Sequence, residues 1–585
     1  MAFGAAPNHI GFGVLVPHPT WCGRFRLTER LKLWMPWASA HGALLMGAGA
    51  VRDLSFIIIL LVITCFLGFF GLGKMALTDP DETFYAQTAK EMISRGEWVT
   101  PFIFGKPQFE KPIFYYWLVI ISYMIFGITE FAARFPSAVF GIIGIIGTYY
   151  LGRLLFSKTC GFFAGLVLAT SMLYVVFSRA CVTDMVLTTF ILLCMLFFLL
   201  GQVRGKAVCY IASSVMAALA VLTKGPIGLF IPAVVAALYI TFTRGWKKTF
   251  SKVPLFWCIV VFLAVSLPWY IAVTRMHGSL FIDEFFGFHN VTRFLEAEHV
   301  IGTSPFFYIP VVIGGFYPWS IFFLFGSWDM YKKGEAASPV KSAGLFLAIW
   351  FLTVFLFFSL SSTKLVTYIF PLFPVMAVVT GRFWEKFLLA EEAQRTVRKE
   401  MNIAYSIFAA TSFIALVAVY FVVKNEYPQA LKGLLASELL FALLLAVSVL
   451  FFIKRKGMLS FASVILTIMV TTIPVIRYIL PVVEEHESSK ALSLKIKDLS
   501  KGTEPLGGEC DHRRGIAFYA DRTDIVDIHS YSDLGEFISR KERVWGIIQK
   551  KHYNQMKESK RGARLEAPFQ SGEYVIITNK AFTGD

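Results

Sequence analysis

Long apolar runs alternate with short polar segments along most of this 585-residue chain. The runs are continuous, without a polar residue at every second position, and most have the roughly 18–20 residues with which a helix crosses a bilayer core of about 30 Å. Helices satisfy every backbone N–H and C=O internally, as lipid requires. The pattern predicts about thirteen spans, near 54–72, 131–151, 161–178, 185–201, 207–222, 226–242, 254–274, 307–326, 343–360, 365–381, 401–423, 434–453 and 459–480.

One further apolar segment, "IFYYWLVIISYMIFG" at 113–127, is shorter than a span. If it does not cross, the most basic loops face the same side as the basic N-terminal tail, which the positive-inside rule favours. We therefore predict a helix at the outer interface, with Tyr115, Tyr116 and Trp117 at the level of the lipid headgroups. The N-terminus is then inside and the C-terminus outside.

These patterns divide the chain into three regions. Residues 1–50 are rich in Gly and Ala and lack the form of a signal peptide, so we expect a disordered tail or a start codon assigned too early. Residues 51–483 form the predicted transmembrane domain. Residues 484–585 are polar, and "GIAFYA", "VWGIIQ" and "YVIITN" read as strands while "SDLGEFISRK" reads as a helix. The fold class is an all-α polytopic membrane protein with a small C-terminal α/β domain outside the membrane.

Composition excludes several classes of function. The net charge of +16 lies mainly in short loops between spans, where it sets orientation, so nucleic-acid binding is not predicted. Eight scattered cysteines include no CxxC pair or Cys/His cluster, which argues against a disulfide scaffold and a cysteine zinc site. No phosphate-binding loop or dinucleotide fingerprint is found, so no nucleotide cofactor is expected.

Unusual polar residues collect at the predicted outer ends of five segments. Ionisable groups at that depth are costly and usually face a protein-lined cavity, so we predict an outward-facing site. The segments are "TDPDETFYAQTAKEMISRGEWVTPFIFGKPQFEKP" at 78–112, "SRACVTDM" at 178–185, "TKGP" at 223–226, "FFGFHNVTRF" at 285–294 and "STKLVTYIFP" at 362–371.

Two carboxylates are the leading catalytic candidates. Asp79, Pro80 and Glu82 fit the N-cap, N1 and N3 positions of a helix, so capping is an alternative role for the acids beside Asp81. Asp184 stands at the start of a span without a capping pattern. Carboxylates from two separate loops suit sugar transfer, in which one can deprotonate an acceptor and the other can stabilise an oxocarbenium-like centre.

Basic residues of the same segments could clamp a phosphate, although snorkelling to lipid phosphates is the alternative. Glu110 and His289 could hold a divalent metal (Zn, Mg or Mn), although a lone His is more often structural. Glu82, Tyr85 and Arg179 are expected on the acceptor side of the pocket. The phosphate candidates are Lys111, Lys224, Arg293, Lys364 and, beside them, Tyr368.

The ordered set "DETFYAQTAKEMISRGEWVTP…FEKP", "SRACVTDM", "LTKGP" and "KLVTYIFP" resembles the bacterial lipid-A aminoarabinose transferases. These belong with the protein O-mannosyltransferases among the GT-C membrane glycosyltransferases, and the resemblance covers roughly 54–480. It implies an inverting transferase that moves a hexosyl or pentosyl group from a polyprenyl-phosphate carrier to a lipid (such as lipid A), glycan or protein acceptor. It also implies the bacterial inner membrane, with the active site and the C-terminal domain in the periplasm.

The resemblance also assigns roles to individual residues. Asp81 resembles the first catalytic acid of the family and Asp184 the second. One departure is that Phe84 stands where those enzymes carry an arginine, in "DETRYA". The remaining assignments are Lys111 and Arg293 at the carrier phosphate, Glu110 and His289 as a metal pair, and Tyr368 as a gating tyrosine.

Two alternative functions would require other sequence features. A transporter or flippase of lipid-linked sugar would hold charges near mid-membrane on repeated, broken helices, whereas these charges sit at one edge. A catalytically inactive scaffold would bind partners through the C-terminal domain. The intact pair Asp81 and Asp184 favours an enzyme over both.

Overall fold

The computed structural model describes residues 35–292, 304–333, 342–389, 395–500, 502–509, 512–558 and 565–580. Most of the predicted tail at 1–50 lies outside them. The chain divides into two units, residues 1–55 and 56–585, and the site lies wholly within the second.

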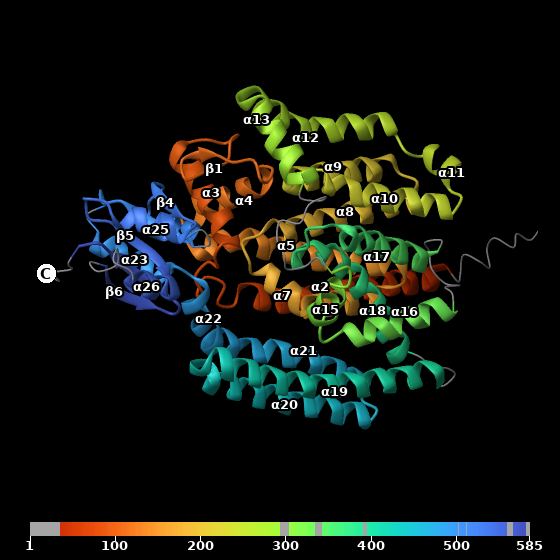
Figure 1. Cartoon of the computed structure of the whole chain (residues 1–585). Coiled ribbons are helices and arrows are strands. Elements are labelled where there is room, and N and C mark those ends of the chain that lie inside the picture. Colours follow the sequence, from red (N-terminus) through yellow and green to blue (C-terminus); the bar gives the residue numbers. More distant parts are fainter. Residues whose placement is uncertain are drawn as a thin grey trace, which may run out of the picture. The chain divides into compact units, whose positions relative to one another are not determined.

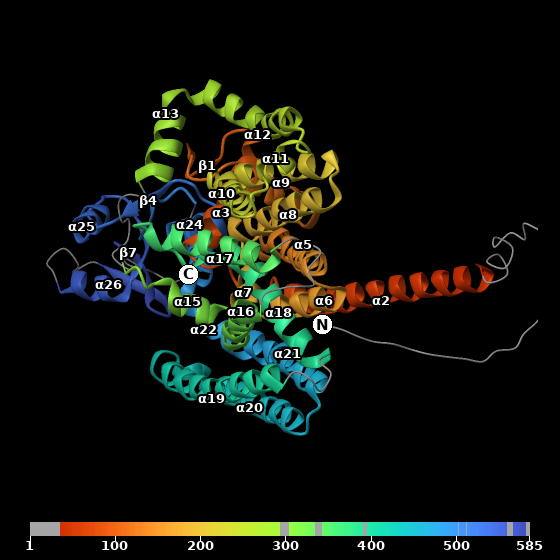
Figure 2. The ribbon, with the colours of Figure 1, turned by 90° about the vertical axis from the view of Figure 1, so that its right-hand side faces the viewer.

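Helices make up most of the second unit (Figures 1 and 2). Among the described residues, ten helices are long and apolar enough to cross a membrane, and two bent pairs bring the number to twelve. The ten segments are α2 (Met35–Phe69), α5 (Glu130–Leu155), α8 (Thr183–Arg204), α9 (Ala207–Lys224), α12 (Leu255–His277), α17 (Ala343–Leu360), η2 (Val366–Leu372) with α18 (Phe373–Leu389), α19 (Arg395–Glu426), η3 (Pro428–Ala430) with α20 (Leu431–Ile453), and α21 (Gly457–Pro474) with η4 (Val475–Ile479) and α22 (Leu480–Glu487).

The predicted all-α membrane fold is confirmed, and the prediction of thirteen spans is higher than the ten to twelve found in the described part of the chain. The pair α6 (Lys158–Ala169) and α7 (Met172–Ser178) bends by 69°, and the pair α15 (Tyr308–Gly315) and α16 (Ser320–Lys333) bends by 104°. The remaining predicted span, at 226–242, is the shorter helix α10 (Ile227–Phe242).

Helix α4 (Phe114–Phe126) corresponds to the segment predicted at the interface and is shorter than a span. Both Tyr115 and Tyr116 are wholly buried in the protein, so their rings do not face the lipid headgroups as the prediction expected. Their rings pack instead around Tyr85 of α3 (Asp81–Arg95). Shorter elements between the spans are β1 (Phe102–Ile103), β2 (Lys106–Pro107), α11 (Trp246–Phe250), α13 (Ser279–Ile282) and η1 (Asp283–Thr292).

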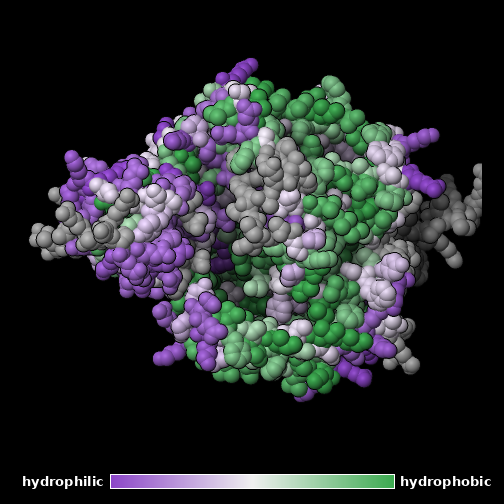
Figure 3. Space-filling model, viewed as in Figure 1, coloured by the Kyte–Doolittle hydropathy of each residue, from purple (hydrophilic) through white to green (hydrophobic). Residues whose placement is uncertain are grey.

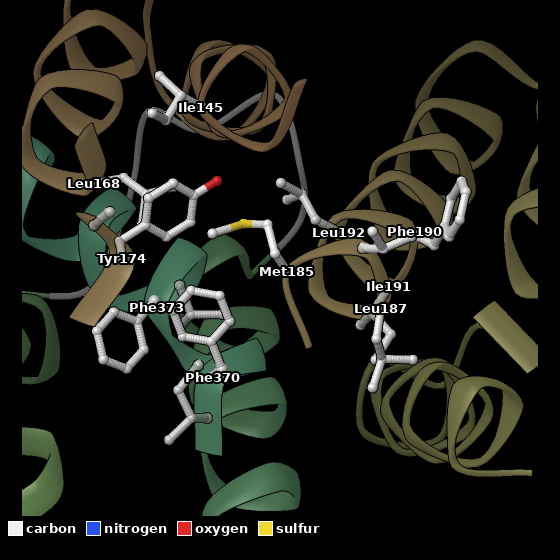
Figure 4. Packing of buried hydrophobic residues seen from close by; sticks show 14 of the residues in the cluster. Ile145, Leu168, Tyr174, Met185, Leu187, Phe190, Ile191, Leu192, Phe370 and Phe373 are labelled. Atoms are coloured by element: carbon white, nitrogen blue, oxygen red, sulfur yellow. The ribbon is translucent and has the colours of Figure 1, made fainter. Parts of the chain in front are cut away.

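Aromatic packing fixes the ends of the helices that carry the site (Figure 4). The Tyr174 ring of α7 stacks on Phe370 of η2 with centroids 5.4 Å apart, and Met185 of α8 lies beside them. A Cβ at Gly144 would lie 2.3 Å from the Tyr174 hydroxyl, so α5 approaches α7 closely only because this residue is glycine. The packing therefore holds the start of α8 and η2 in fixed positions.

The C-terminal region is a small α/β domain, as predicted, and its surface is hydrophilic whereas the membrane helices present an apolar surface (Figure 3). In the described residues its sheet has the order β4-β3-β5-β7-β6, with β3 parallel to β4 and β5, and β7 antiparallel to β5 and β6. The elements are α23 (Lys490–Leu499), β3 (Leu506–Glu509), α24 (Arg513–Ala520), β4 (Ile525–Ile528), α25 (Tyr531–Ile538), β5 (Trp545–Gln549), α26 (Lys550–Lys557), β6 (Glu566–Ser571) and β7 (Tyr574–Thr578).

The prediction that "GIAFYA" forms a strand is wrong, because this segment lies in helix α24. Ile516, Ala517 and Ala520 pack in the core of the domain, while Phe518 and Tyr519 join the core of the membrane domain. A helix buried on two faces has a continuous apolar run, which resembles that of a buried strand.

Helix α24 docks on the beginning of α3 through a buried hydrogen-bond network. The wholly buried Asp79 carboxylate accepts hydrogen bonds from the Ser489 hydroxyl at 2.7 Å and from Thr83 at 2.6 Å. His512 places Nδ1 3.1 Å from the same carboxylate. A Cβ at Gly515 would lie 2.4 Å from both Asp79 oxygens, so only glycine allows this approach.

We predict that Gly515→Ala weakens the docking of the C-terminal domain by about 1–3 kcal/mol, the usual cost of an overpacked contact. Limited proteolysis and thermal unfolding of the purified protein in detergent would measure the loss. Gly314→Ala is the matched control, since a Cβ there meets nothing within 4 Å. Equal behaviour of the two variants would contradict the proposed close contact.

Candidate functional site

The first turn of α3 differs from the predicted cap. The helix begins at Asp81 with Pro80 at the cap position, and no side chain caps it. Asp79 instead binds the C-terminal domain, while Glu82 accepts a hydrogen bond from the Thr78 backbone N–H at 3.0 Å. The Asp81 side chain takes no part in these contacts.

Glu82 and Arg134 form a buried ion pair behind this turn. Arg134 Nη2 donates to Glu82 Oε2 at 2.6 Å, and Nε donates to Oε1 at 2.8 Å. The Cys181 backbone N–H also donates to Glu82, at 2.7 Å. Burial opposes ionisation, but the charge and hydrogen bonds of Arg134 hold the pKa of the Glu82 carboxyl below its ordinary value. Glu82, predicted on the acceptor side, has its carboxylate fully engaged in structural contacts.

Asp184 and Lys224 meet because α8 and α9 are antiparallel neighbours. Asp184 is the second residue of α8 and Lys224 the last of α9, and Lys224 Nζ donates to Asp184 Oδ1 at 2.6 Å. The same ammonium lies 4.9 Å from the centroid of the Tyr368 ring in η2. Three of the five segments predicted to share one site thus converge.

A second ion pair comes from the segment before α4, where Lys111 Nζ lies 3.2 Å from Glu110 Oε1. Glu110, Lys111, Asp184, Lys224 and Tyr368 line one cavity of about 370 Å³. The rest of its wall is mostly apolar. The cavity thus joins a charged end to a hydrocarbon-like wall, which suits an amphiphile with an anionic group. Its other lining residues are Leu187, Pro226, Ile227, Phe230, Phe285, Phe357, Phe358, Ser361 and Pro371.

Asp81 lies close enough to this cavity for its charge to interact with the acids there. Burial by the surrounding protein is the largest influence and raises the pKa of the Asp81 carboxyl, whereas the positive charge of Arg514 lowers it. The negative charges of Asp184, Glu110 and Glu82 raise that pKa further. In the described part of the chain Asp81 makes no hydrogen bond or ion pair, so its oxygens are open to a ligand.

Three other predicted residues do not line the cavity and make contacts within the protein. Tyr85 is buried between aromatic rings, with its hydroxyl 3.5 Å from Thr183 Oγ1. Arg179 donates to the Leu67 carbonyl at 2.8 Å and ties α7 to the end of α2. Lys364 is buried and donates to the Ser361 carbonyl at 2.6 Å. These contacts support the wall, and none of the three lines the cavity.

The predicted metal pair is only partly described. The side chains of His289 and Arg293 lie outside the described residues. Within the residues that are described, no group of three or more His, Cys, Asp or Glu could hold a metal ion. Metal binding by Glu110 and His289 therefore stays a prediction.

Sequence reasoning missed Arg514, a residue of α24 whose guanidinium carbon lies 4.7 Å from the Phe84 ring centroid. It is more than 400 positions from α3, and it directly precedes "GIAFYA", the segment predicted as a strand. No spacing signal in the chain could have linked Arg514 to Asp81.

Known proteins resemble this chain in sequence. Residues 110–271 match the family described as dolichyl-phosphate-mannose-protein mannosyltransferase. An uncharacterized protein of Aquifex aeolicus (strain VF5) is 27% identical over 473 residues, which are 80% of this chain and 87% of that protein. An undecaprenyl phosphate-alpha-4-amino-4-deoxy-L-arabinose arabinosyl transferase of Enterobacter sp. (strain 638) is 31% identical over 340 residues, 57% of this chain. The match spans 60% of the length of that transferase.

A solved structure resembles the fold. The crystal structure of ArnT from Cupriavidus metallidurans bound to undecaprenyl phosphate has a TM-score of 0.76 and 22% identity, covering 90% of this chain and 98% of that chain. The chain therefore shares the fold of that structure. The family match and the sequence relatives confirm the resemblance to the aminoarabinose transferases and protein mannosyltransferases that the ordered motifs predicted.

We predict that Glu82→Ala lowers the free energy of unfolding by about 3–5 kcal/mol, because it leaves the Arg134 guanidinium buried without its carboxylate. Chemical unfolding in detergent, followed by tryptophan fluorescence, would measure the loss. Glu542→Ala is the control, since its pair with Arg540 is exposed and such pairs contribute at most about 1 kcal/mol. A loss at Glu82 as small as that of the control would show that the pair is not structural.

Proposed function

We propose, taking the chain as a member of the GT-C superfamily that includes the aminoarabinose transferases and the protein mannosyltransferases, that it is a glycosyltransferase. It moves a hexosyl or pentosyl group from a polyprenyl-phosphate carrier to an acceptor hydroxyl of a lipid, glycan or protein. The observation that carries this proposal is the open carboxylate of Asp81 beside a cavity that joins paired charges to an apolar wall.

The cavity holds the donor with its apolar wall and with its charged end. Apolar side chains, among them Phe230, Phe285 and Phe357, contact the first part of the prenyl chain. Lys111 and Lys224 hold the phosphate, because ammonium groups are strong partners of a phosphate anion. Each lysine forms an ion pair with a carboxylate, so binding of the phosphate exchanges those pairs for contacts with the phosphate.

Asp81 is the general base. Its carboxylate takes the proton of the acceptor hydroxyl, the hydroxyl oxygen bonds to the anomeric carbon, and the bond from that carbon to the phosphate oxygen breaks with inversion. The electron pair leaves with the polyprenyl phosphate, whose charge Lys111 and Lys224 neutralise, so no general acid is needed. Asp184 orients Lys224 and offers negative charge to the oxocarbenium-like centre.

A divalent ion (Zn, Mg or Mn) held by Glu110 and His289 is a further part of the proposal. An ion on Glu110 would compete with Lys111, whose ammonium already lies 3.2 Å from that carboxylate. When bound, such an ion would add positive charge beside the donor phosphate.

We place the cavity at the outer, periplasmic face of the inner membrane. It opens at the ends of α8 and α9 that lie near α3, and α3 packs against the C-terminal domain. The basic loops lie at the opposite ends of these helices, where the positive-inside rule places the cytoplasm. The alternative of a transporter or flippase is not favoured, because the charged groups lie at helix ends and not at mid-membrane.

We predict that Asp81→Asn lowers transfer from a polyprenyl-phosphate sugar by about 100- to 10,000-fold, the usual contribution of a general base. Because burial raises the pKa of Asp81, wild-type activity should fall on acidification at a pH above the ordinary range of an aspartate, about 3.9. Asp184→Asn should also lower the rate. Asp524→Asn, an exposed carboxylate of the C-terminal domain, is the control. Full activity of both site variants would reject the assignment.

We predict that Lys111→Ala weakens binding of polyprenyl phosphate by roughly 10- to 100-fold, because a charge-assisted contact is worth about 1.5–3 kcal/mol. Binding of a radiolabelled polyprenyl phosphate to the detergent-purified protein would measure the change. Lys248→Ala removes a basic residue from a loop at the other end and should leave binding intact. Equal affinity of the two variants would mean that the phosphate binds elsewhere.

A further inference from the structure

A basic residue of the C-terminal domain reaches the first turn of α3. Arg514 lies with its guanidinium carbon 4.7 Å from the centroid of the Phe84 ring, an arrangement in which the ring face attracts the cation. Its Nη1 donates to the Pro80 carbonyl across a long contact of 3.5 Å. The side chain is half-buried, and among the described residues it forms no ion pair. Most of its donor groups therefore remain uncommitted beside Asp81.

The surrounding packing fixes the position of this side chain. Gly515 lies against the Asp79 carboxylate, and Tyr519 accepts a hydrogen bond from the Leu77 backbone N–H at 2.8 Å. Lys90 of α3 donates to the Phe518 carbonyl at 2.8 Å. Contacts on both sides of α24 thus hold the helix against the start of α3. The position of Arg514 is therefore fixed by the packing of α24.

The charges around the mouth of the cavity explain why a cation is needed there. Four carboxylates lie close together, and three of them contact a basic partner. Asp81 contacts none in the described part of the chain, and the cation that acts on it is Arg514. Without that cation, three neighbouring negative charges would favour the protonated form of Asp81, which cannot accept a proton. The contacting pairs are Glu82 with Arg134, Glu110 with Lys111, and Asp184 with Lys224.

We propose that Arg514 is a positioning residue of the transfer site and that it keeps Asp81 ionised and available to the acceptor. The C-terminal domain thereby completes the site. Phe84, which stands where the resemblance places an arginine, supplies the ring on which Arg514 rests, so the cation reaches α3 from another domain. The inference rests on the proposed function for the catalytic meaning of the charge on Asp81.

The charge of Asp81 can be measured without donor or acceptor. A hydrophobic carbodiimide adds to a protonated carboxyl, and mass spectrometry of the Asp81 peptide across a pH series gives the pH of half-labelling. We expect Arg514→Gln to move this pH upward, because a cation that lowers the pKa of Asp81 is lost. Arg514→Lys should restore the wild-type value, and so should Phe84→Arg combined with Arg514→Gln. Asp81→Asn identifies the labelled residue.

Arg513→Ala is the matched control on the same helix. Arg513 lies over the Phe104 ring at 3.8 Å and pairs with Asp527, so its loss disturbs docking without removing the cation beside Asp81. We expect its half-labelling pH to equal that of the wild type. Thermal unfolding of each variant separates a folded protein from an unfolded one. An unchanged labelling pH in folded Arg514→Gln, or an equal shift in Arg513→Ala, would overturn the proposal.

Transfer assays then separate this inference from the proposed function. If Arg514→Gln raises the labelling pH, we expect the pH at which its transfer activity falls on acidification to rise as well. A labelling shift in a protein that transfers no sugar would retain the electrostatic role of Arg514 and reject the transferase function. An Arg514→Gln variant that transfers sugar but shows no shift in labelling pH would retain the transferase function and reject the electrostatic role of Arg514.

Discussion

Arg134 lies in the membrane-spanning helix α5, yet its donors go to the carboxylate of Glu82 and to three backbone carbonyls of the segment between α2 and α3. Burying this charge is unfavourable unless every donor finds a partner, so the surrounding backbone has little freedom. Glu82 also binds the backbone before α8 through Cys181. One ion pair thus joins the segment between α2 and α3, the first turn of α3, α5 and the start of α8, and the positions of Asp81 and Asp184 depend on it.

Much of the fold and of the cavity could be predicted because each signal is local. An apolar run of about 20 residues predicts a span by itself, and polar residues at the ends of runs predict a site at one membrane level. The contact between Asp184 and Lys224 follows from two antiparallel helices and a short turn. The bends in α6–α7 and α15–α16 were not predicted, because the hydropathy of a bent span equals that of a straight one.

Other parts of the site could not be predicted because they depend on contacts between distant segments. The capping pattern at Asp79 was correctly read as helical, but the partners of Asp79 come from Ser489 and His512 in another domain. Glu82 was predicted on the acceptor side of the pocket because it lies next to Asp81 in the sequence. Only its buried ion pair with Arg134 shows that its role is structural. Arg514 belongs to a segment whose apolar run does not distinguish a helix with two buried faces from a strand.

The hydrogen bond between Asp79 and Ser489 joins residues 410 positions apart, so it has a consequence for biosynthesis. The first polar segment emerges from the membrane early, whereas its partner is made only after every span has been inserted. During that interval Asp79 lacks its partners in the C-terminal domain. A chain that ends before the last hundred residues would therefore contain the membrane helices without the contacts that Ser489 and His512 make with Asp79.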